Sequence, residues 1–385
     1  MKYTLAIVHD YLTHVGGAEM VLKSMGKIWA EAPIYTLIHD KKTIGANFIN
    51  NPIKESFLKK APSFLKKRRK LILPLLAVAP ETFDLREFDV ALSSSGAFSK
   101  GIITKPNTVS ICYCHSPMRF AWDYTHQYLR ELSLNKPKKL LARLVLNYIR
   151  LWDVVSADRV DYFIANSRAT QEKIKKYYRR ESTVIYPPVE TDLFKPKNNS
   201  ATFSKGSKKQ NRDKGYYLIV SRLSAYKKID VAVEAFNKLG WKLVVIGEGP
   251  EYKNLKKIAG ATVKILGSKS RKEVINYFQG CRGYILPAEE DFGISAVEAM
   301  ATGKPVLALR AGGALETVVE GVTGEFFDAT TVEVLAEGAY RIEQARKNYN
   351  SQEIIKQAQK FSRHNFETKI KQFIEEKYEE FKNKS

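Results

Sequence analysis

Short apolar runs alternate with amphipathic stretches along most of the chain. "YTLAIVHD" continues into "THVGGAEMVLKSMGKIW", which predicts a buried strand, a glycine turn and a helix with one apolar face. "FDVALSSS", "TVSICYCH" and "VDYFIANS" predict further strands of the first half. Strands that alternate with helices in this way favour parallel sheets of the doubly wound α/β type.

The same rhythm begins again after residue 215. "YYLIVSRL" precedes the predicted helix "VAVEAFNKLG", and "WKLVVIGEG", "TVKILGS", "GYILPA" and "PVLALR" predict the strands that follow. A chain of 385 residues exceeds one ordinary hydrophobic core, and about two domains are expected at this length. The restart therefore predicts two similar α/β domains.

The seam between them falls at "STVIYPPVETDLFKPKNNS", where two prolines stiffen the chain. We expect a first domain over residues 1–187 and a second over 188–364. Residues 197–214 are polar, basic and without periodicity, which predicts a flexible surface insertion. The last segment, 365–385, has the pattern of a charged amphipathic helix.

Composition is that of a soluble globular protein, with 44% hydrophobic and 27% charged residues. No uninterrupted apolar stretch reaches the roughly 18 residues of a membrane-spanning helix. The opening apolar run is short and shows no signal-peptide cleavage site, so we expect it to be a strand. Three cysteines predict no disulfide framework and favour the reducing cytoplasm. Cys112 and Cys114 alternate on one predicted strand and should face the same side of a sheet, with too few ligands nearby to predict a metal site.

Positive charge is in large excess, with 63 Lys and Arg against 41 Asp and Glu and a net charge of +22. Such an excess favours an anionic partner, which could be nucleic acid, acidic lipid or a phosphorylated substrate. The chain contains no helix-turn-helix signature, zinc-finger spacing or aromatic RNA-binding motif, which disfavours a nucleic-acid-binding protein.

Much of this charge lies in one segment of the first half. Residues 54–70 contain eight cations and one acid, interleaved with phenylalanines and leucines. One interpretation is a solvated helical hairpin that covers the core. The other is an element pressed against an anionic bilayer, where each cation contributes roughly 1 kcal/mol. The residues that would bind the membrane are Lys66, Lys67, Arg68, Arg69 and Lys70.

Candidate binding residues follow the predicted strands, because open α/β sheets bind ligands beyond the carboxyl ends of their strands. Gly16 and Gly17 follow the first strand and precede a helix, where backbone N–H groups can approach a phosphate. Arg222 ends "YYLIVSRL", and Lys227 comes five residues later. Two cations at one strand-to-helix loop suit a diphosphate.

Two carboxylates stand eight positions apart in "AEEDFGISAVEAM". Glu290 follows the predicted strand "GYILPA", Gly293 allows a close turn, and Glu298 lies about one turn inside the helix that follows. Carboxylates in a pocket that binds anions are favourable only if they accept hydrogen bonds from hydroxyl groups. One glutamate could therefore hold a hexose and the other a ribose.

The chain resembles the retaining glycosyltransferases of family 4, which have the GT-B fold. "EEDFGISAVEAM" resembles their E-x7-E signature, and "GGAE", "SRLSAYKKID", "VIGEGPE", "EAMATGKPVLAL", "GGALETV" and "GVTGEFF" follow the family pattern in order. "VHDYLTHVGGAE" and "CHSPMRFAWDY" resemble a subgroup assigned as mannosyltransferases. The resemblance implies two Rossmann-like domains that face a central cleft, an acceptor-binding N-terminal domain, a donor-binding C-terminal domain, and a final helix that packs back on the first.

The resemblance also implies roles for single residues. Glu290 would contact the donor hexose, Glu298 the ribose, and Arg222 and Lys227 the diphosphate. A lysine, Lys228, stands where the family often has glycine, so either lysine could contact phosphate. Other contacts would come from Gly17, which closes over the diphosphate, from the amides of Phe292, Gly293 and Ile294, and from His115 near the reacting sugar. His9 and His14 also lie near predicted strand ends and are weaker candidates.

The resemblance implies hexose transfer from a nucleotide sugar with retention at the anomeric carbon. The chain has no Asp-x-Asp motif, and the cations and helix N-termini could stabilise the departing diphosphate without a metal or another cofactor. The subgroup points to GDP-mannose, with a UDP-hexose as the alternative. We expect a glycan or polyprenyl-diphosphate-linked acceptor at the cytoplasmic face of the cell membrane. An epimerase or phosphorylase of the same fold is a further alternative.

Overall fold

The computed structural model describes residues 3–45, 48–62, 64, 72–132, 134–197 and 215–384. The chain divides into two compact units, unit 1 (Met1–Pro188 and Phe366–Ser385) and unit 2 (Val189–Asn365). These bounds differ by one residue from those expected from the sequence. Most of the basic insertion expected at 197–214 lies outside the described residues, as do Lys66, Lys67, Arg68, Arg69 and Lys70.

Unit 1 is built on a seven-stranded parallel sheet with the strand order β3-β2-β1-β4-β5-β6-β7. Its strands are β1 (Leu5–Leu12), β2 (Ile34–His39), β3 (Ile53–Glu55), β4 (Val90–Ser95), β5 (Val109–Cys114), β6 (Tyr162–Ala165) and β7 (Ser182–Val184). The order runs outward in both directions from the β1–β4 pair. In doubly wound sheets, the carboxyl ends of such a central pair form the usual ligand site.

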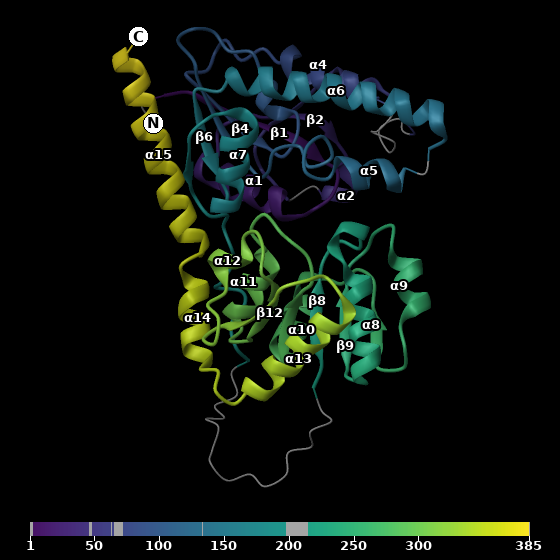
Figure 1. The fold of residues 1–385 in the computed structure, drawn as a ribbon. Coiled ribbons are helices and arrows are strands. Elements are labelled where there is room, and N and C mark those ends of the chain that lie inside the picture. The colour runs from purple at the N-terminus through teal and green to yellow at the C-terminus, as the bar shows by residue number, and fades with distance from the viewer. Residues whose placement is uncertain are drawn as a thin grey trace. The chain divides into compact units, whose positions relative to one another are not determined.

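Helices cover both faces of this sheet (Figure 1). The described helices of unit 1 are α1 (Gly17–Ile28), α2 (Lys41–Ile44), η1 (Phe57–Lys60), α4 (Leu73–Val78), η3 (Ala79–Thr82), η4 (Ser99–Gly101), α5 (Thr125–Glu131), α6 (Lys136–Asp158), α7 (Arg168–Tyr178) and α15 (Arg363–Lys384). One face packs against α1 and α15, and the other against α4 and α6.

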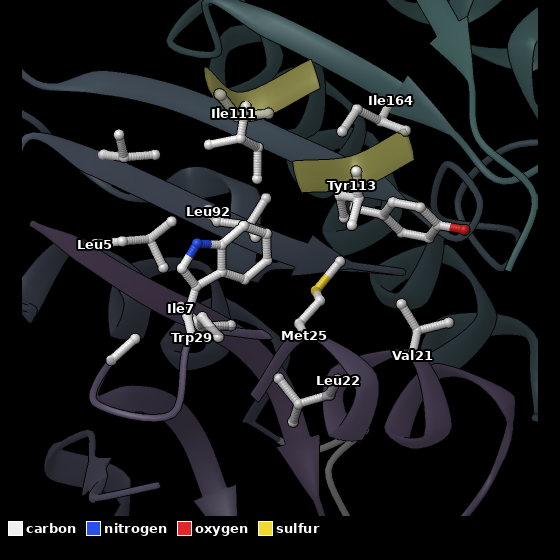
Figure 2. Packing of buried hydrophobic residues seen from close by; sticks show 14 of the residues in the cluster. Leu5, Ile7, Val21, Leu22, Met25, Trp29, Leu92, Ile111, Tyr113 and Ile164 are labelled. Atoms are coloured by element: carbon white, nitrogen blue, oxygen red, sulfur yellow. The ribbon is translucent and has the colours of Figure 1, made fainter. Parts of the chain in front are cut away.

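Figure 2 shows the core on the α1 face of the sheet. Val21, Leu22 and Met25 of α1, together with Trp29, point toward Ile7 and its neighbours on the strands. Apolar residues recur on α1 at the spacing of one helix face, and that face is buried here.

The C-terminal helix α15 completes this core although it follows the whole of unit 2 in sequence. Phe366, Ile370, Phe373 and Ile374 are buried in the same cluster as α1 and the strands. The expectation that the final helix returns to the first domain is thereby confirmed.

Unit 2 repeats the plan with a six-stranded parallel sheet in the order β10-β9-β8-β11-β12-β13. Its strands are β8 (Tyr217–Val220), β9 (Leu243–Ile246), β10 (Val263–Ile265), β11 (Gly283–Leu286), β12 (Val306–Leu309) and β13 (Gly324–Phe327). Its helices are η5 (Ala225–Lys227), α8 (Ile229–Leu239), α9 (Tyr252–Ile258), α10 (Arg271–Gly280), α11 (Ile294–Ala301), α12 (Ala314–Thr317), α13 (Val332–Ala345) and α14 (Ser351–Gln359). Here the order runs outward from the β8–β11 pair, and the predicted doubly wound architecture of both halves is confirmed.

Candidate active site

The loops that follow β8 and β11 lie side by side at the carboxyl edge of the unit 2 sheet. Lys227 ends η5 after β8, and Glu290 lies in the loop after β11. Their side chains form an ion pair, with 13% and 19% of the side-chain surface exposed. Two residues that the sequence assigned to phosphate and hexose are thus brought together, at the position where doubly wound sheets bind ligands.

The other two cations of the β8 loop are arranged differently. Arg222 is exposed, and its guanidinium has no side-chain partner among the described residues. Lys228 adopts a left-handed backbone, with φ of 52°, immediately before α8. Glycine adopts this conformation most easily, so a lysine is unusual at this position. Of the two adjacent lysines, Lys227 is the one that contacts Glu290.

The β8 loop is held by the segment that follows β9. Leu223 N donates to Glu248 O at 2.9 Å, and Glu251 N donates to Leu223 O at 3.0 Å. Gly247 is packed so closely that a Cβ atom on it would lie 1.8 Å from Ser221 O. The "VIGEGPE" stretch therefore fixes the backbone that carries Arg222 and Lys227.

The Glu290 loop rests in the same way on a pair of glycines that follow β12. Gly313 N donates to Glu290 O at 2.9 Å. A Cβ atom on Gly312 would lie 2.3 Å from Glu290 O, and one on Gly313 would lie 2.4 Å from Phe292 Cα. The glycines of "GGALETV" thus allow backbone contact beneath the acid, a role that the sequence did not reveal.

The start of α11 is fixed against both central strands. Gly293 precedes the helix with φ of 88°, a left-handed conformation that favours glycine. Tyr284 Oη, from within β11, donates to Val220 O at 3.0 Å and lies 2.7 Å from Ser295 Oγ, which links β11 and the end of β8 to the first turn of α11. Ile294 begins the helix, and the Phe292 side chain is buried against Phe361.

Glu298 is buried in α11 and is balanced by an arginine that the sequence did not single out. Arg271, at the start of α10, places Nη1 2.9 Å from Glu298 Oε1 and Nη2 3.0 Å from Glu190 Oε2. Its guanidinium also lies over the Phe194 ring, 4.5 Å from the centroid. Burial raises the pKa of Glu298, and the charge of Arg271 acts in the opposite direction.

Arg222 was selected because it lies at the end of a predicted strand, and Arg271 also follows one. The stretch "GSKSRKE" offers three cations, however, and only the fold shows which one reaches Glu298. The helix start is set by a capping box, in which Ser270 and Glu273 bond each other's backbone N–H groups. This cap places Arg271 in the first turn.

In unit 1, the side chains of His9, Ser94 and His115 connect the central strands β1, β4 and β5. His115, directly after β5, places Nε2 2.8 Å from Ser94 Oγ. Ser94 Oγ lies 3.1 Å from His9 Nδ1, and His9 Nε2 lies 3.9 Å from Glu19 Oε1. His9, Ser94 and Glu19 are buried. The predicted candidate His115 is thus held by a chain of polar side chains from three elements.

The glycine turn of unit 1, at Gly16 and Gly17, is held by Glu19. Gly16 N donates to Glu19 Oε2 at 2.9 Å, and Gly17 begins α1. His14, a weaker candidate, lies 3.8 Å from Glu19 Oε1. Burial is the largest single effect on the pKa of Glu19 and acts to raise it. The hydrogen bond from His9 and the charges of His9 and His14 together outweigh burial, so the pKa of this carboxyl lies below its usual value. Phosphate contact by Gly16 and Gly17 stays a prediction.

Asp10 is a structural acid that the sequence did not identify as such. Its carboxylate accepts hydrogen bonds from the backbone N–H groups of Gly96, Phe98 and Ser99 at 2.7, 2.8 and 2.7 Å. It therefore fixes the turn after β4, next to Ser94. Three amide donors to one carboxylate leave it little capacity for a ligand.

The cysteines and the possible metal ligands complete the picture of the described residues. Cys112 and Cys114 are buried in one apolar cluster, as expected from their alternation on β5. Burial raises the pKa of the Cys112 thiol to about 12. Within the described ranges, no group of three or more His, Cys, Asp or Glu side chains is placed to hold a metal ion.

Two family models together match most of the chain. Residues 15–193 match the model described as Glycosyltransferase Family 4, and residues 200–361 match the model described as Glycosyl transferases group 1. The chain is a glycosyltransferase of the GT-B type.

Curated relatives of this glycosyltransferase are distant. The uncharacterized glycosyltransferase MJ1178 of Methanocaldococcus jannaschii is 28% identical over 169 residues, which cover 43% of this chain and 44% of the relative. The alpha-1,3/1,6-mannosyltransferase ALG2 of Candida glabrata is 26% identical over 374 residues, covering 83% of this chain and 78% of the relative. The chain thus spans less than half the length of the first relative.

A solved structure shows the same fold. Anabaena Alr3699/HepE in complex with UDP-glucose superposes with a TM-score of 0.68 and 18% sequence identity, covering 97% of this glycosyltransferase and 100% of the other chain. At this identity the likeness concerns the GT-B fold alone.

We predict that Arg271→Leu destabilises the enzyme more at neutral than at acidic pH. Without Arg271, burial raises the pKa of Glu298 further, so the charged carboxylate costs stability above that pKa and the protonated form avoids the cost below it. We expect the substitution to lower the free energy of unfolding by about 2 kcal/mol at neutral pH. The partial exposure of Arg271 to solvent keeps the loss to this size. The loss should shrink as the pH falls.

Urea unfolding at neutral pH and at about pH 5 measures this difference. The matched control is Lys238→Leu, which breaks an exposed ion pair with Glu333 and should change stability little at either pH. An equal loss from Arg271→Leu at both pH values would contradict the account of Glu298.

We predict that Ser94→Ala lowers kcat about fivefold with little change in the KM for donor, because His115 loses one hydrogen bond that orients it. Steady-state kinetics with the donor separates the two constants. Ser93→Ala is the control, since Ser93 is also buried on β4 but its Oγ donates to Ile111 O at 3.4 Å. Equal kinetic effects of the two variants would show that Ser94 has no specific role.

Proposed function

We propose that this glycosyltransferase moves a hexose from a nucleotide-sugar donor to a glycan or lipid-linked glycan, with retention at the anomeric carbon. The observation that carries the proposal is the arrangement of Glu290 and Glu298 at the edge of the unit 2 sheet. Each carboxylate is balanced by a cation from a different loop, Lys227 or Arg271. A diphosphate sugar offers both hydroxyl groups for acids and phosphate oxygens for cations.

Donor binding would rearrange the Lys227–Glu290 pair. The ammonium group that now contacts Glu290 would bind a phosphate oxygen, and the carboxylate would accept hydrogen bonds from hexose hydroxyls. Arg222, exposed and with no described side-chain partner, is available to the same diphosphate. The N-terminal N–H groups of α11, beginning at Ile294, would add to the stabilisation of the leaving group.

The donor we propose is GDP-mannose. This choice is supported by the likeness to ALG2, a protein named as an alpha-1,3/1,6-mannosyltransferase, at 26% identity. A UDP-hexose is the second candidate, because Anabaena HepE has been solved with UDP-glucose. Neither a metal nor another cofactor is part of the proposed reaction. We further propose a polyprenyl-diphosphate-linked acceptor and a peripheral position at the cytoplasmic membrane face.

We expect GDP and GDP-mannose to raise the melting temperature more than UDP and UDP-glucose at equal concentration, because a ligand stabilises the fold that binds it. Incubation with the better donor and candidate acceptors should give a product whose anomeric configuration matches the donor by NMR. The yield should be unchanged by EDTA. A larger shift with UDP would assign a UDP-hexose, whereas an inverted product or loss of activity in EDTA would overturn the proposed mechanism.

We expect Arg222→Ala and Lys227→Ala each to cost roughly 2–4 kcal/mol of transition-state stabilisation, measured from kcat/KM. Lys227→Ala should also weaken donor binding, because Glu290 then lacks its cation next to the phosphates. Lys253→Ala, which removes an exposed cation from α9, is the control and should retain normal turnover. Near-normal kcat/KM in either site variant would remove that residue from the diphosphate site.

A further inference from the structure

Helix α6 of unit 1 turns an apolar face into solvent. The large apolar side chains on this face are between 49% and 64% exposed. They recur at intervals of three and four residues and so form one stripe along the helix. The exposed stripe consists of Leu140, Leu141, Leu144, Tyr148, Leu151 and Val155. Contiguous apolar surface of this kind marks an interaction site in a protein that is otherwise well packed.

The opposite side of α6 is fixed, so the helix cannot roll to bury the stripe. Leu146 and Ile149 are buried, and so is the carboxylate of Asp153. Asp153 pairs with the buried Lys100, and it accepts hydrogen bonds from Trp122 Nε1 at 2.7 Å and from Tyr178 Oη at 2.9 Å. Rotation of α6 would leave buried charges without partners, which is strongly unfavourable.

The charges beside the stripe indicate what covers it. Lys136 and Arg143 are exposed and stand seven residues apart, so they lie along one border of the stripe. The half-buried Arg150 continues this row, and its guanidinium donates to Ala121 O at 3.0 Å. Lys138 and Lys139 add to the charge of the first turn, and residues 136–152 contain no acid. An apolar face with cations along its border is the pattern of a helix that lies in the interface of an anionic bilayer.

We propose that the exposed stripe of α6 docks this glycosyltransferase on an anionic lipid membrane. The neighbouring helix α4 packs against α6 (Figure 1), and two of its apolar side chains, Leu75 and Val78, are also exposed. A second copy of the chain fits less well. Two such faces would bring rows of cations together without acids to pair them.

This surface differs from the segment assigned to the membrane from sequence, residues 66–70, which lies outside the described residues. Of the helices within the described ranges, none is long and apolar enough to span a bilayer. The inference rests on the peripheral membrane position of the proposed function and names the surface that would make the contact. Its test uses neither donor nor acceptor, so it can fail while the proposed sugar transfer stands.

Binding to vesicles of phosphatidylcholine and phosphatidylglycerol in equal parts is measured by co-sedimentation. We expect the wild-type chain to bind and the variant L140Q/L144Q/L151Q to bind about 100-fold more weakly, since each leucine loses its transfer into the interface. The matched control L193Q/L315Q replaces two exposed leucines of unit 2 and should bind as the wild type does. Circular dichroism and melting curves verify that each variant is folded.

The charge contribution is tested with K136Q/K139Q/R143Q. We expect about 100-fold weaker binding to the anionic vesicles, a smaller change with pure phosphatidylcholine, and weaker wild-type binding at high salt. Wild-type protein that ignores anionic vesicles, or a leucine variant that binds as tightly as the control, overturns the proposal. So does a wild-type dimer that the leucine variant converts to a monomer, without vesicle binding by either.

A site-specific probe locates the contact. All three native cysteines are buried, so an environment-sensitive thiol dye can be directed to Leu144→Cys. Its emission should shift to the blue when anionic vesicles are added, whereas the same dye at Leu315→Cys in unit 2 should not respond. A response at Leu315→Cys alone would place the membrane contact elsewhere and overturn the proposal.

Discussion

Compensation of two carboxylates at one sheet edge is the constraint on which the unit 2 site depends. Glu290 and Glu298 come from one loop–helix segment, but their cations come from elsewhere, Lys227 after β8 and Arg271 after β10. Parallel strands bring these loops together because their carboxyl ends share an edge. This pairing of acids with cations is the basis of our proposal that the site binds a ligand with both hydroxyl and phosphate groups.

Unit 1 also carries linked polar side chains at the carboxyl ends of its central strands. Asp10 fixes the turn after β4 through three backbone N–H groups, and the adjacent His9 connects through Ser94 to His115. Both units thus put their polar side chains at the point where the strand order diverges. The apolar residues behind them, such as those of α1 and α15, supply the rigidity that keeps these side chains in place.

The return of the last helix was implied only by the resemblance to the family, whereas the sequence predicted the doubly wound halves because periodicity and strand-end position are local properties. For the same reason it located Arg222, Lys227 and Glu290 near strand ends. Pairings are not local: nothing in "GSKSRKE" distinguishes Arg271 from its neighbouring lysines until α10 and α11 are packed. The exposed stripe of α6 was equally hidden, since leucines occur on both its buried and its exposed sides. The side that faces the core carries the buried Asp153, whose partner Lys100 is more than fifty residues away in sequence.

Gly312 and Gly313 pack against the backbone of the Glu290 loop, so the position of this acid depends on a segment other than its own. Glu290 is chosen in one segment, yet the space for its carbonyl is set more than twenty residues later in the chain. Side chains introduced in that later segment would displace the loop that carries Glu290. If Glu290 contacts the donor as we propose, a substitution at Gly312 or Gly313 would alter activity through the position of this carboxylate, and its effect would resemble that of a substitution of Glu290 itself.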